Sequence, residues 1–96
     1  MCLQSSRFDA FVAEDELVFA VMGIGRFLVE RTLRDLEALL DTERFVRVHK
    51  QAIVNLAKIK ELEPILKGGA TARLESGQTI EISRRYAHEL RRKLGW

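Results

Sequence analysis

The chain has 96 residues, of which 47% are hydrophobic and 31% are charged, and its formal net charge at pH 7 is +2. A chain of this length has room for one domain with one hydrophobic core, and its composition is typical of a soluble globular protein. No apolar run approaches the roughly 18 residues of a membrane-spanning helix, and the first residues lack the apolar segment of a signal peptide. The single Cys2 cannot form an internal disulfide. We therefore expect a cytoplasmic protein without membrane contact.

The charge is unevenly distributed along the sequence. Residues 1–43 contain four Lys or Arg and nine Asp or Glu, a net charge of −5. Residues 44–96 contain twelve Lys or Arg and five Asp or Glu, a net charge of +7. Such asymmetry indicates a polyanionic partner. The alternative is that the basic residues only cover a solvated face.

The N-terminal third of the chain contains short segments with the alternation of β-strands. The expected strands are 9–13, 17–22 and 26–31, separated by a polar corner at 14–16 and a glycine turn at 23–25. No linker or internal repeat divides the sequence. We expect residues 1–8 to be a loose N-terminal segment and residues 9–96 to form one domain.

The period changes to that of a helix between Thr32 and Leu40. Thr32 is a suitable N-cap, and Asp35 lies three residues further on, where an acid favours the first turn. Leucines at positions 33, 36, 39 and 40 recur at helical spacing, which predicts a short helix packed against a sheet. The stripe is too short for a coiled coil.

The second half of the chain predicts a strand at 58–65, a glycine turn at 67–69 and a hairpin at 70–83. Pro64 near the end of the first of these strands favours a sheet edge. In the hairpin, a three-residue loop at 75–77 keeps each face of the sheet uniform, which a buried sheet requires. Gly77 then takes a positive φ. The expected pairs are Ala70 with Ile82, Thr71 with Glu81, Ala72 with Ile80, and Arg73 with Thr79.

Residues 44–56 combine an alternating strand with a compact polar corner, His49-Lys50-Gln51, followed by apolar residues. This pattern predicts a short, stiff, positively charged loop at a folded edge. Lysine at a loop tip can contact a phosphate or a guanine edge, and Gln51 can contact phosphate or adenine. His49 either braces the corner by bonding to backbone or faces a nucleic acid; we favour the brace. Asn55 is expected to close the corner by side-chain to backbone bonds.

A second basic element follows at Ser83-Arg84-Arg85, where Ser83 is a natural N-cap of a helix over 84–94 that ends before Gly95. Two arginines in the first turn are unfavourable beside the positive end of the helix dipole unless an anion binds there. Free backbone N–H groups and guanidinium groups together make a phosphate site. The alternative is that the arginines pair with Glu81 or with acids of the first half.

Enzyme chemistry finds no support in the sequence. The two histidines, the single cysteine and the scattered acids have no metal-ligand spacing. There is no nucleophile–base signature and no glycine-rich phosphate loop. We therefore expect no catalytic residue, no metal and no cofactor.

Several of these features occur together in a known family. The run Phe45-x-Arg47-Val48-His49-Lys50-x-x-Ile53-Val54-Asn55-Leu56, followed by Ile82-Ser83-Arg84-Arg85-Tyr86, resembles the LytTR DNA-binding domain, the output domain of LytR/AlgR-type response regulators. The resemblance covers about residue 9 to the C-terminus. It implies a mainly β protein with short α-helices, an elongated stack of small antiparallel sheets. It also implies binding to double-stranded DNA in a two-component system of transcription regulation.

The resemblance further implies that loops, rather than a recognition helix, enter successive major grooves. By position, the base-contacting residues are Lys50, Arg85 and Glu16. The residues expected to contact phosphate or to support the loops are Arg47, His49, Gln51, Lys58, Lys67 and Arg84. Glu16 departs from the family pattern because it repels phosphate, although it can accept a hydrogen bond from a cytosine amine.

The resemblance leaves the wider assembly open. Members of the family often carry a receiver domain ahead of this one, which these 96 residues do not include, so the chain is either a stand-alone regulator or a fragment. A second copy on repeated half-sites is a further expectation. Two other functions stay open: a binder of single-stranded RNA or DNA, which needs exposed aromatic side chains, and a β-rich interaction module with an acidic protein partner.

Overall fold

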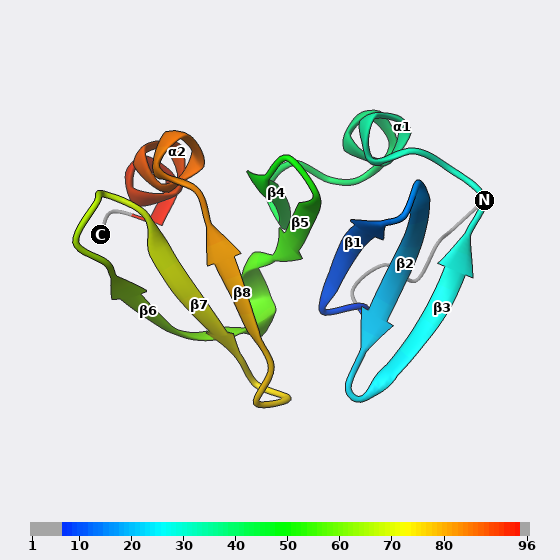
Figure 1. The fold of residues 1–96 in the computed structure, drawn as a ribbon, viewed down its shortest axis with the longest axis horizontal. Coiled ribbons are helices and arrows are strands. Elements are labelled where there is room, and N and C mark those ends of the chain that lie inside the picture. Colours follow the sequence, from blue (N-terminus) through cyan, green and yellow to red (C-terminus); the bar gives the residue numbers. More distant parts are fainter. Residues whose placement is uncertain (1–6, 95–96) are drawn as a thin grey trace.

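The computed structural model describes residues 7–94, which form a body of 37 × 25 × 25 Å (Figure 1). Within these residues, eight strands form two antiparallel sheets, so the predicted mainly β fold with short helices is confirmed. The strands are β1 Ala10–Glu14, β2 Leu17–Met22, β3 Gly25–Val29, β4 Phe45–His49, β5 Ala52–Asn55, β6 Ile59–Pro64, β7 Ala70–Leu74 and β8 Thr79–Ile82. The helices are α1 Leu33–Leu39, α2 Arg84–Leu94 and the short 3-10 helix η2 Leu56–Lys58.

The larger sheet has the strand order β3-β2-β1-β5-β4, and the smaller has the order β6-β7-β8. All three strands predicted for the first third of the chain are present: β2 has the predicted bounds, and β1 and β3 differ from the expected ranges by one or two residues at each end. The predicted corner at 14–16 is shorter than expected, because Glu14 still pairs with Leu17 and only Asp15 and Glu16 turn the chain. These two residues have φ of 50° and 65°, the conformation of a type I′ hairpin turn.

The β7–β8 hairpin has the register that face-matching predicts. Ala72 opposes Ile80, and the other three expected pairs are also present. The Leu74 N–H donates to the Gln78 carbonyl at 2.8 Å, so the loop is the three residues 75–77, and Gly77 has a φ of +94°. The register was predictable because Ala70, Ala72 and Leu74 are all completely buried on one face.

Both predicted helices are present, with one correction. Thr32 caps α1 in a reciprocal capping box with Asp35, as predicted. Leu33, Leu36 and Leu40 are buried, but Leu39 is 55% exposed, so the predicted inward stripe contains three leucines rather than four. A helix of seven residues covers the sheet with only one narrow face, and Leu39 points away from it. In α2, Ala87 and Leu90 are fully buried as expected.

The core consists of two clusters, one on each face of the larger sheet. Along β4, Phe45 belongs to the cluster under α1, and Val48 belongs to the cluster under α2. The alternation noted in the sequence therefore places successive side chains in different cores. The sheets are joined where the Ser83 N–H donates to the Val48 carbonyl at 2.9 Å.

Asn55 closes its corner as predicted. Its side chain is 1% exposed, donates to the Phe8 carbonyl at 2.9 Å and accepts from the Ala57 N–H at 3.0 Å. Phe8 also packs against Phe11, with ring centroids 5.6 Å apart. Phe8 therefore belongs to the packed domain and not to the loose segment expected for residues 1–8. The expectations for Cys2 and for the helix stop at Gly95 lie outside the described residues.

Candidate nucleic-acid interface

Three connections lie along one edge of the molecule: the β1–β2 turn at 15–16, the β4–β5 turn at 50–51 and the β8–α2 junction at 83–85. We call this the loop edge (Figure 1). The topology brings them together. The end of β1 adjoins the start of β5, where the Ala13 N–H donates to the Gln51 carbonyl at 2.9 Å. The bond from Ser83 to Val48 then places the start of α2 beside the same turn.

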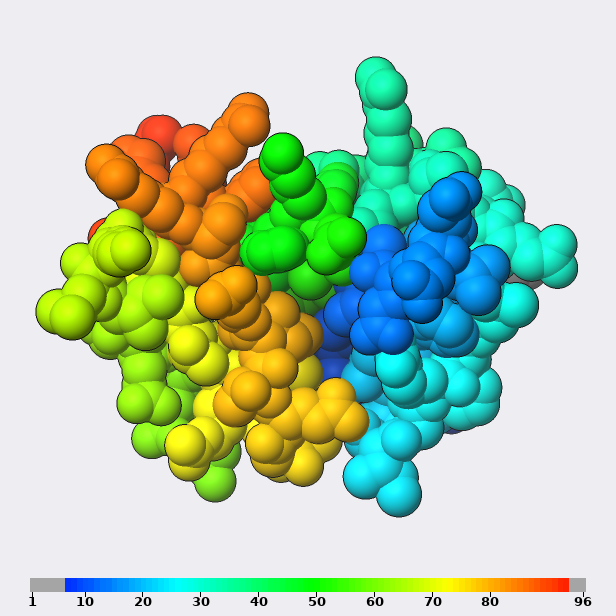
Figure 2. All heavy atoms as spheres, viewed as in Figure 1, coloured from blue at the N-terminus to red at the C-terminus, as the bar shows by residue number. Residues whose placement is uncertain are grey.

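The β2–β3 and β7–β8 turns lie at the opposite edge. There the Gln78 side-chain amide donates to the Gly23 carbonyl at 2.8 Å, which joins the two turns. In the space-filling view, side chains from the segments of the loop edge project from the upper rim, coloured orange, green and blue (Figure 2). The loop edge is thus a rim of projecting side chains rather than a closed pocket.

The β4–β5 turn has an unusual construction. Lys50 and Gln51 join β4 and β5 without a positive φ, a geometry that matches the twist of paired strands poorly. A register shift between Arg47 and His49 accommodates the mismatch as a β-bulge. A turn of this kind needs side-chain support to hold one conformation.

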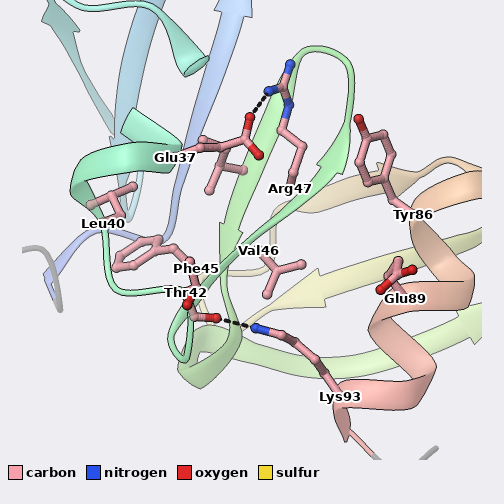
Figure 3. A pocket seen from close by; sticks show the side chains of 10 residues that line it. Glu37, Leu40, Thr42, Phe45, Val46, Arg47, Tyr86, Glu89 and Lys93 are labelled. Atoms are coloured by element: carbon pink, nitrogen blue, oxygen red, sulfur yellow. Dashed lines mark hydrogen bonds and ion pairs between the residues drawn. The ribbon is translucent and has the colours of Figure 1, made fainter. Parts of the chain in front are cut away.

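Arg47 supplies that support. Its Nε donates to the His49 carbonyl at 2.8 Å, a terminal nitrogen donates to the Lys50 carbonyl, and the other pairs with Glu37 of α1 at 2.5 Å (Figure 3). The side chain is only 18% exposed. All three nitrogens of the guanidinium are therefore engaged within the protein. Of the two predicted roles for Arg47, phosphate contact or support, the geometry favours support.

His49 braces the same turn. Its Nδ1 accepts from the Gln51 N–H at 3.2 Å, and its Nε2 lies 3.9 Å from a carboxylate oxygen of Glu81. This is the structural arrangement favoured from the sequence. Lys50 and Gln51 are themselves exposed at the tip, so the brace leaves their side chains directed to solvent.

The β8–α2 junction presents two exposed arginines. Arg84 and Arg85 occupy the first turn of α2, which contains no acidic residue. Among residues 7–94, neither arginine has an acidic partner, and Glu81 lies next to His49 instead. The Arg85 guanidinium lies 5.7 Å from the centre of the Tyr86 ring. The first turn of α2 therefore carries positive charge that no acidic side chain of the described residues balances, and such a helix end favours an anion.

The two remaining lysines have different positions. Lys67 belongs to the β6–β7 loop, and a Cβ at the neighbouring Gly68 would lie 3.1 Å from Arg84, so this loop adjoins the junction. Lys58 is the last residue of η2, and the next residue, Ile59, pairs with Leu74. This pair lies at the end of the smaller sheet that is far from the loop edge. The end near the loop edge is marked by the pair of Ala70 and Ile82. The structure brings Lys67 to the loop edge and places Lys58 away from it.

Glu16 lies at the other end of the loop edge, in the type I′ turn. The adjacent Glu14 pairs with Arg26 at 3.1 Å, whereas Asp15 and Glu16 are exposed without a cationic partner among residues 7–94. The loop edge is therefore acidic at the β1–β2 turn and basic at the β4–β5 turn and the β8–α2 junction. The charge asymmetry of the sequence becomes a gradient along this edge.

One functional contact was missed from the sequence: Glu37, which anchors Arg47 to α1. A glutamate on the solvated side of a helix carries no signal for such a role. A hollow of about 230 Å³ adjoins this pair between α1, β4 and α2 (Figure 3). Its rim group Lys93 donates to the Thr42 carbonyl, so that this amine, like Glu37 and Arg47, is already bonded within the protein.

No helix in the described part of the chain is long and apolar enough to cross a membrane. Residues 7–94 also contain no group of three or more His, Cys, Asp or Glu that could hold a metal ion. The features that stand out along the loop edge are therefore its braced turn and its exposed cations.

A fold of two small antiparallel sheets with cationic loops along one edge matches a known class of DNA-binding domain. The family model described as "LytTr DNA-binding domain" matches residues 3–95, and the chain belongs to this family. A solved LytTR DNA-binding domain of a protein described as a methyl-accepting/DNA response regulator, from Bacillus cereus, superimposes with a TM-score of 0.90 at 25% identity. It covers 96% of this chain and 84% of that one.

Curated relatives are longer proteins. The chain is 35% identical over 68 residues to the sensory transduction protein LytT of Bacillus subtilis, covering 71% of this chain and 28% of LytT. It is 38% identical over 66 residues to the transcriptional regulatory protein BtsR of Escherichia coli, covering 69% of this chain and 26% of BtsR. The matched region thus amounts to just over a quarter of the length of these relatives.

Proposed function

We propose that this domain binds double-stranded DNA in a sequence-specific manner, as the DNA-binding part of a bacterial transcription regulator. The observation that carries the proposal is the loop edge, where Lys50, Arg84 and Arg85 are exposed without acidic partners among residues 7–94. Membership of the LytTR family gives this edge its ligand class. A regulator of this kind acts in the cytoplasm and needs no catalytic group.

The dimensions of the molecule fit one face of a duplex. Its long axis is 37 Å, and the three elements of the loop edge follow one another along that axis (Figure 1). Successive major grooves on one face of B-DNA are about 34 Å apart. We propose that loops of this edge enter neighbouring major grooves while the rest of the edge crosses the backbone between them.

The residues of the loop edge fall into two groups, those with side chains exposed to a ligand and those with side chains bonded within the protein. Lys50 and Arg85 are exposed and have no acidic partner among residues 7–94, so we assign them to base edges, where arginine binds guanine O6 and N7 with two hydrogen bonds. Arg84, Lys67 and Gln51 are assigned to phosphates, which position the protein without selecting sequence. Arg47 and His49 hold the central turn. Lys58, at the far end of the sheet, is left out of the contact set.

Glu16 gives the acidic end a role of its own. A carboxylate beside phosphates is repelled, but in the major groove it can accept from the cytosine amine. Glu16 would then add to the sequence specificity of DNA binding rather than to its overall strength, because it favours only those duplexes that place a cytosine beneath it. The receiver domain and the second copy on repeated half-sites remain proposals of the same kind.

The alternative functions receive less support. A binder of single strands needs aromatic side chains for base stacking. In the described part of the loop edge, the aromatic ring beside the cations belongs to Tyr86, and this residue is partly buried. Phe27 is 49% exposed, but it lies on β3, away from the cations. An acidic protein partner would satisfy the cations, but it does not account for the membership of the chain in a DNA-binding family.

The test is a selection of duplexes from a random pool, followed by titration of the selected duplex, its two separated strands and a scrambled duplex. The proposal predicts that the selected duplex binds at least about 1,000-fold more tightly than the scrambled one at moderate salt. Equal affinity for the separated strands would support the single-strand alternative. Absence of any enriched sequence would contradict sequence-specific binding.

A further inference from the structure

Strand β3 forms one edge of the larger sheet and has apolar side chains exposed on both of its faces. Phe27 is 49% exposed on the face that carries α1, and Leu28 is 59% exposed on the opposite face. Leu17, Met22 and Ile24 of the adjoining strand and turn are exposed as well. A ligand that docks on one face of the sheet would cover only half of these side chains, whereas an added strand covers both faces at once.

The edge also lacks the devices that usually prevent strand addition. Residues 25–29 contain neither proline nor lysine, and their pairing with β2 is continuous, without a bulge. Its one charged residue, Arg26, pairs with Glu14 at 3.1 Å and lies 4.5 Å over the Phe19 ring, and its side chain stays 41% exposed and within reach of a second acidic partner. An edge of this kind is open to pairing with another chain.

A partner strand can bond only to those residues of β3 whose backbone N–H and C=O groups point away from β2. Met22 and Gly25 flank a two-residue turn, so they exchange backbone hydrogen bonds with each other. The bonding direction then alternates along β3, and the N–H and C=O groups of Arg26 and Leu28 point outward. An added antiparallel strand must bond to these two residues and to Glu30, which follows the strand.

We propose that β3 pairs antiparallel with β3 of a second copy about a two-fold axis at Leu28. This register sets Leu28 opposite Leu28 and Phe27 opposite Val29. It also sets Arg26 opposite Glu30 twice, once on each side of the axis. An axis at Arg26 would oppose two like charges, and an axis at Phe27 would set Arg26 against Leu28. The edge is therefore self-complementary in one register, which identifies a second copy as the occupant.

The symmetry has a consequence for DNA. A two-fold axis perpendicular to the sheet reverses the strand direction, so the loop edges of the two copies face opposite ways. The β3 dimer thus forms without DNA and holds two separate duplex segments rather than two half-sites on one face. This arrangement differs from the repeated half-site expectation and goes beyond the proposed function.

The first experiment measures association without DNA, by sedimentation equilibrium of the 96-residue chain over a range of concentrations. We expect a monomer–dimer equilibrium whose dissociation constant rises at least about tenfold in Leu28→Lys, because the central pair is lost. Leu66→Lys is the matched control, since Leu66 is fully exposed elsewhere. Circular dichroism checks that both variants fold. A monomeric wild-type chain, or equal dimerisation of the two variants, would overturn the proposal.

A charge exchange tests the register itself. Arg26→Glu and Glu30→Arg should each fail to self-associate, because like charges then oppose each other on both sides of the axis. Mixed in equal amounts, the two variants should form a heterodimer in which both ion pairs are restored. A mixture that stays monomeric while the wild type dimerises would refute the Leu28 register. Binding of Leu28→Lys to a single duplex should equal that of the wild type, so this result is independent of the proposed DNA contacts.

Discussion

The β1–β2 and β4–β5 turns make the same connection, two residues between antiparallel strands on the loop edge, in different ways. Asp15 and Glu16 adopt positive φ, so the backbone itself matches the twist of the strands and no side chain is required. Lys50 and Gln51 do not adopt positive φ, so their turn depends on a register shift in β4 and on side-chain support. Arg47 donates hydrogen bonds to two carbonyls of this segment, and His49 accepts one from the Gln51 N–H. The first turn stores mild backbone strain, and the second uses two basic side chains as supports. A cationic residue near DNA is thus not necessarily a DNA contact.

The largest effect is expected from removing the support of the β4–β5 turn. Arg47→Ala leaves two carbonyls and Glu37 without their donor, and we expect a loss of about 3 kcal/mol in the free energy of unfolding. Urea denaturation measures this. Arg47→Lys is the matched variant, because it keeps the charge but cannot bond in three directions. A loss below about 0.5 kcal/mol for Arg47→Ala would show that the turn is stable by itself.

The next effect concerns DNA contacts at the two cationic elements. Arg85→Ala should lose roughly 1–3 kcal/mol of binding free energy on the selected duplex and much less on random DNA. Lys50→Ala should behave in the same direction. Lys58→Ala, which removes a lysine at the far end of the sheet, is the control and should change neither affinity. If the ratio of specific to random affinity is unchanged in both loop-edge variants, the base-contact assignment is wrong.

Glu37→Gln separates support from charge with a smaller effect. Removing a negative charge near phosphates should strengthen binding to random DNA if Glu37 acts only through its field. If Glu37 anchors Arg47, the variant should weaken binding to the selected duplex by about 0.5–1 kcal/mol, because the pair is partly exposed. Titration of both duplexes distinguishes these outcomes by their sign. Stronger binding to both kinds of DNA would contradict the anchoring role.

The smallest effect tests the strain of the β1–β2 turn. A non-glycine residue at positive φ destabilises the folded state by about 1 kcal/mol. Glycine avoids this strain, but folding then costs a similar amount of conformational entropy, because glycine is more flexible in the unfolded chain. Glu16→Gly should therefore stabilise the fold by only about a few tenths of a kcal/mol, whereas Gln51→Gly should destabilise it by about 0.5 kcal/mol. Thermal unfolding of the two variants side by side measures the difference. Equal effects would mean that the two turns do not differ in backbone strain.

Local patterns predicted most of the fold. The Thr32 capping box, the register of the β7–β8 hairpin and the start of α2 follow from residues close together in sequence. The prediction failed where a contact depends on distant elements. Leu39 matched the helical period but has no sheet beneath it, and Phe8 is held by a side chain 47 residues away.

The basic residues of the candidate loops could be identified from the sequence, but which of their side chains are free to contact a ligand could not. Residue type identified Lys50, Arg84 and Arg85 as basic loop residues, and the structure places them on one edge. The same reasoning placed Arg47 and Lys58 together with Arg84 among the residues expected to contact phosphate or to support the loops. Only the tertiary arrangement shows that the Arg47 nitrogens bond to the turn and to α1, and that Lys58 belongs to the far end of the smaller sheet. Roles depend on which donors remain free, and a sequence does not contain that information.

We propose that the loop edge binds duplex DNA, with Arg84 on a phosphate and Arg47 as support. The most direct measurement is the salt dependence of the dissociation constant for the wild type, Arg84→Ala and Arg47→Lys on the selected duplex. We expect a steep wild-type slope, since each neutralised phosphate contributes about 0.9 to the log–log slope. Arg84→Ala should lower the slope by about that amount, and Arg47→Lys should weaken binding with the slope unchanged. A wild-type slope near zero would contradict DNA binding by the loop edge. Slopes that change equally in the two variants would contradict the separate roles of Arg84 and Arg47.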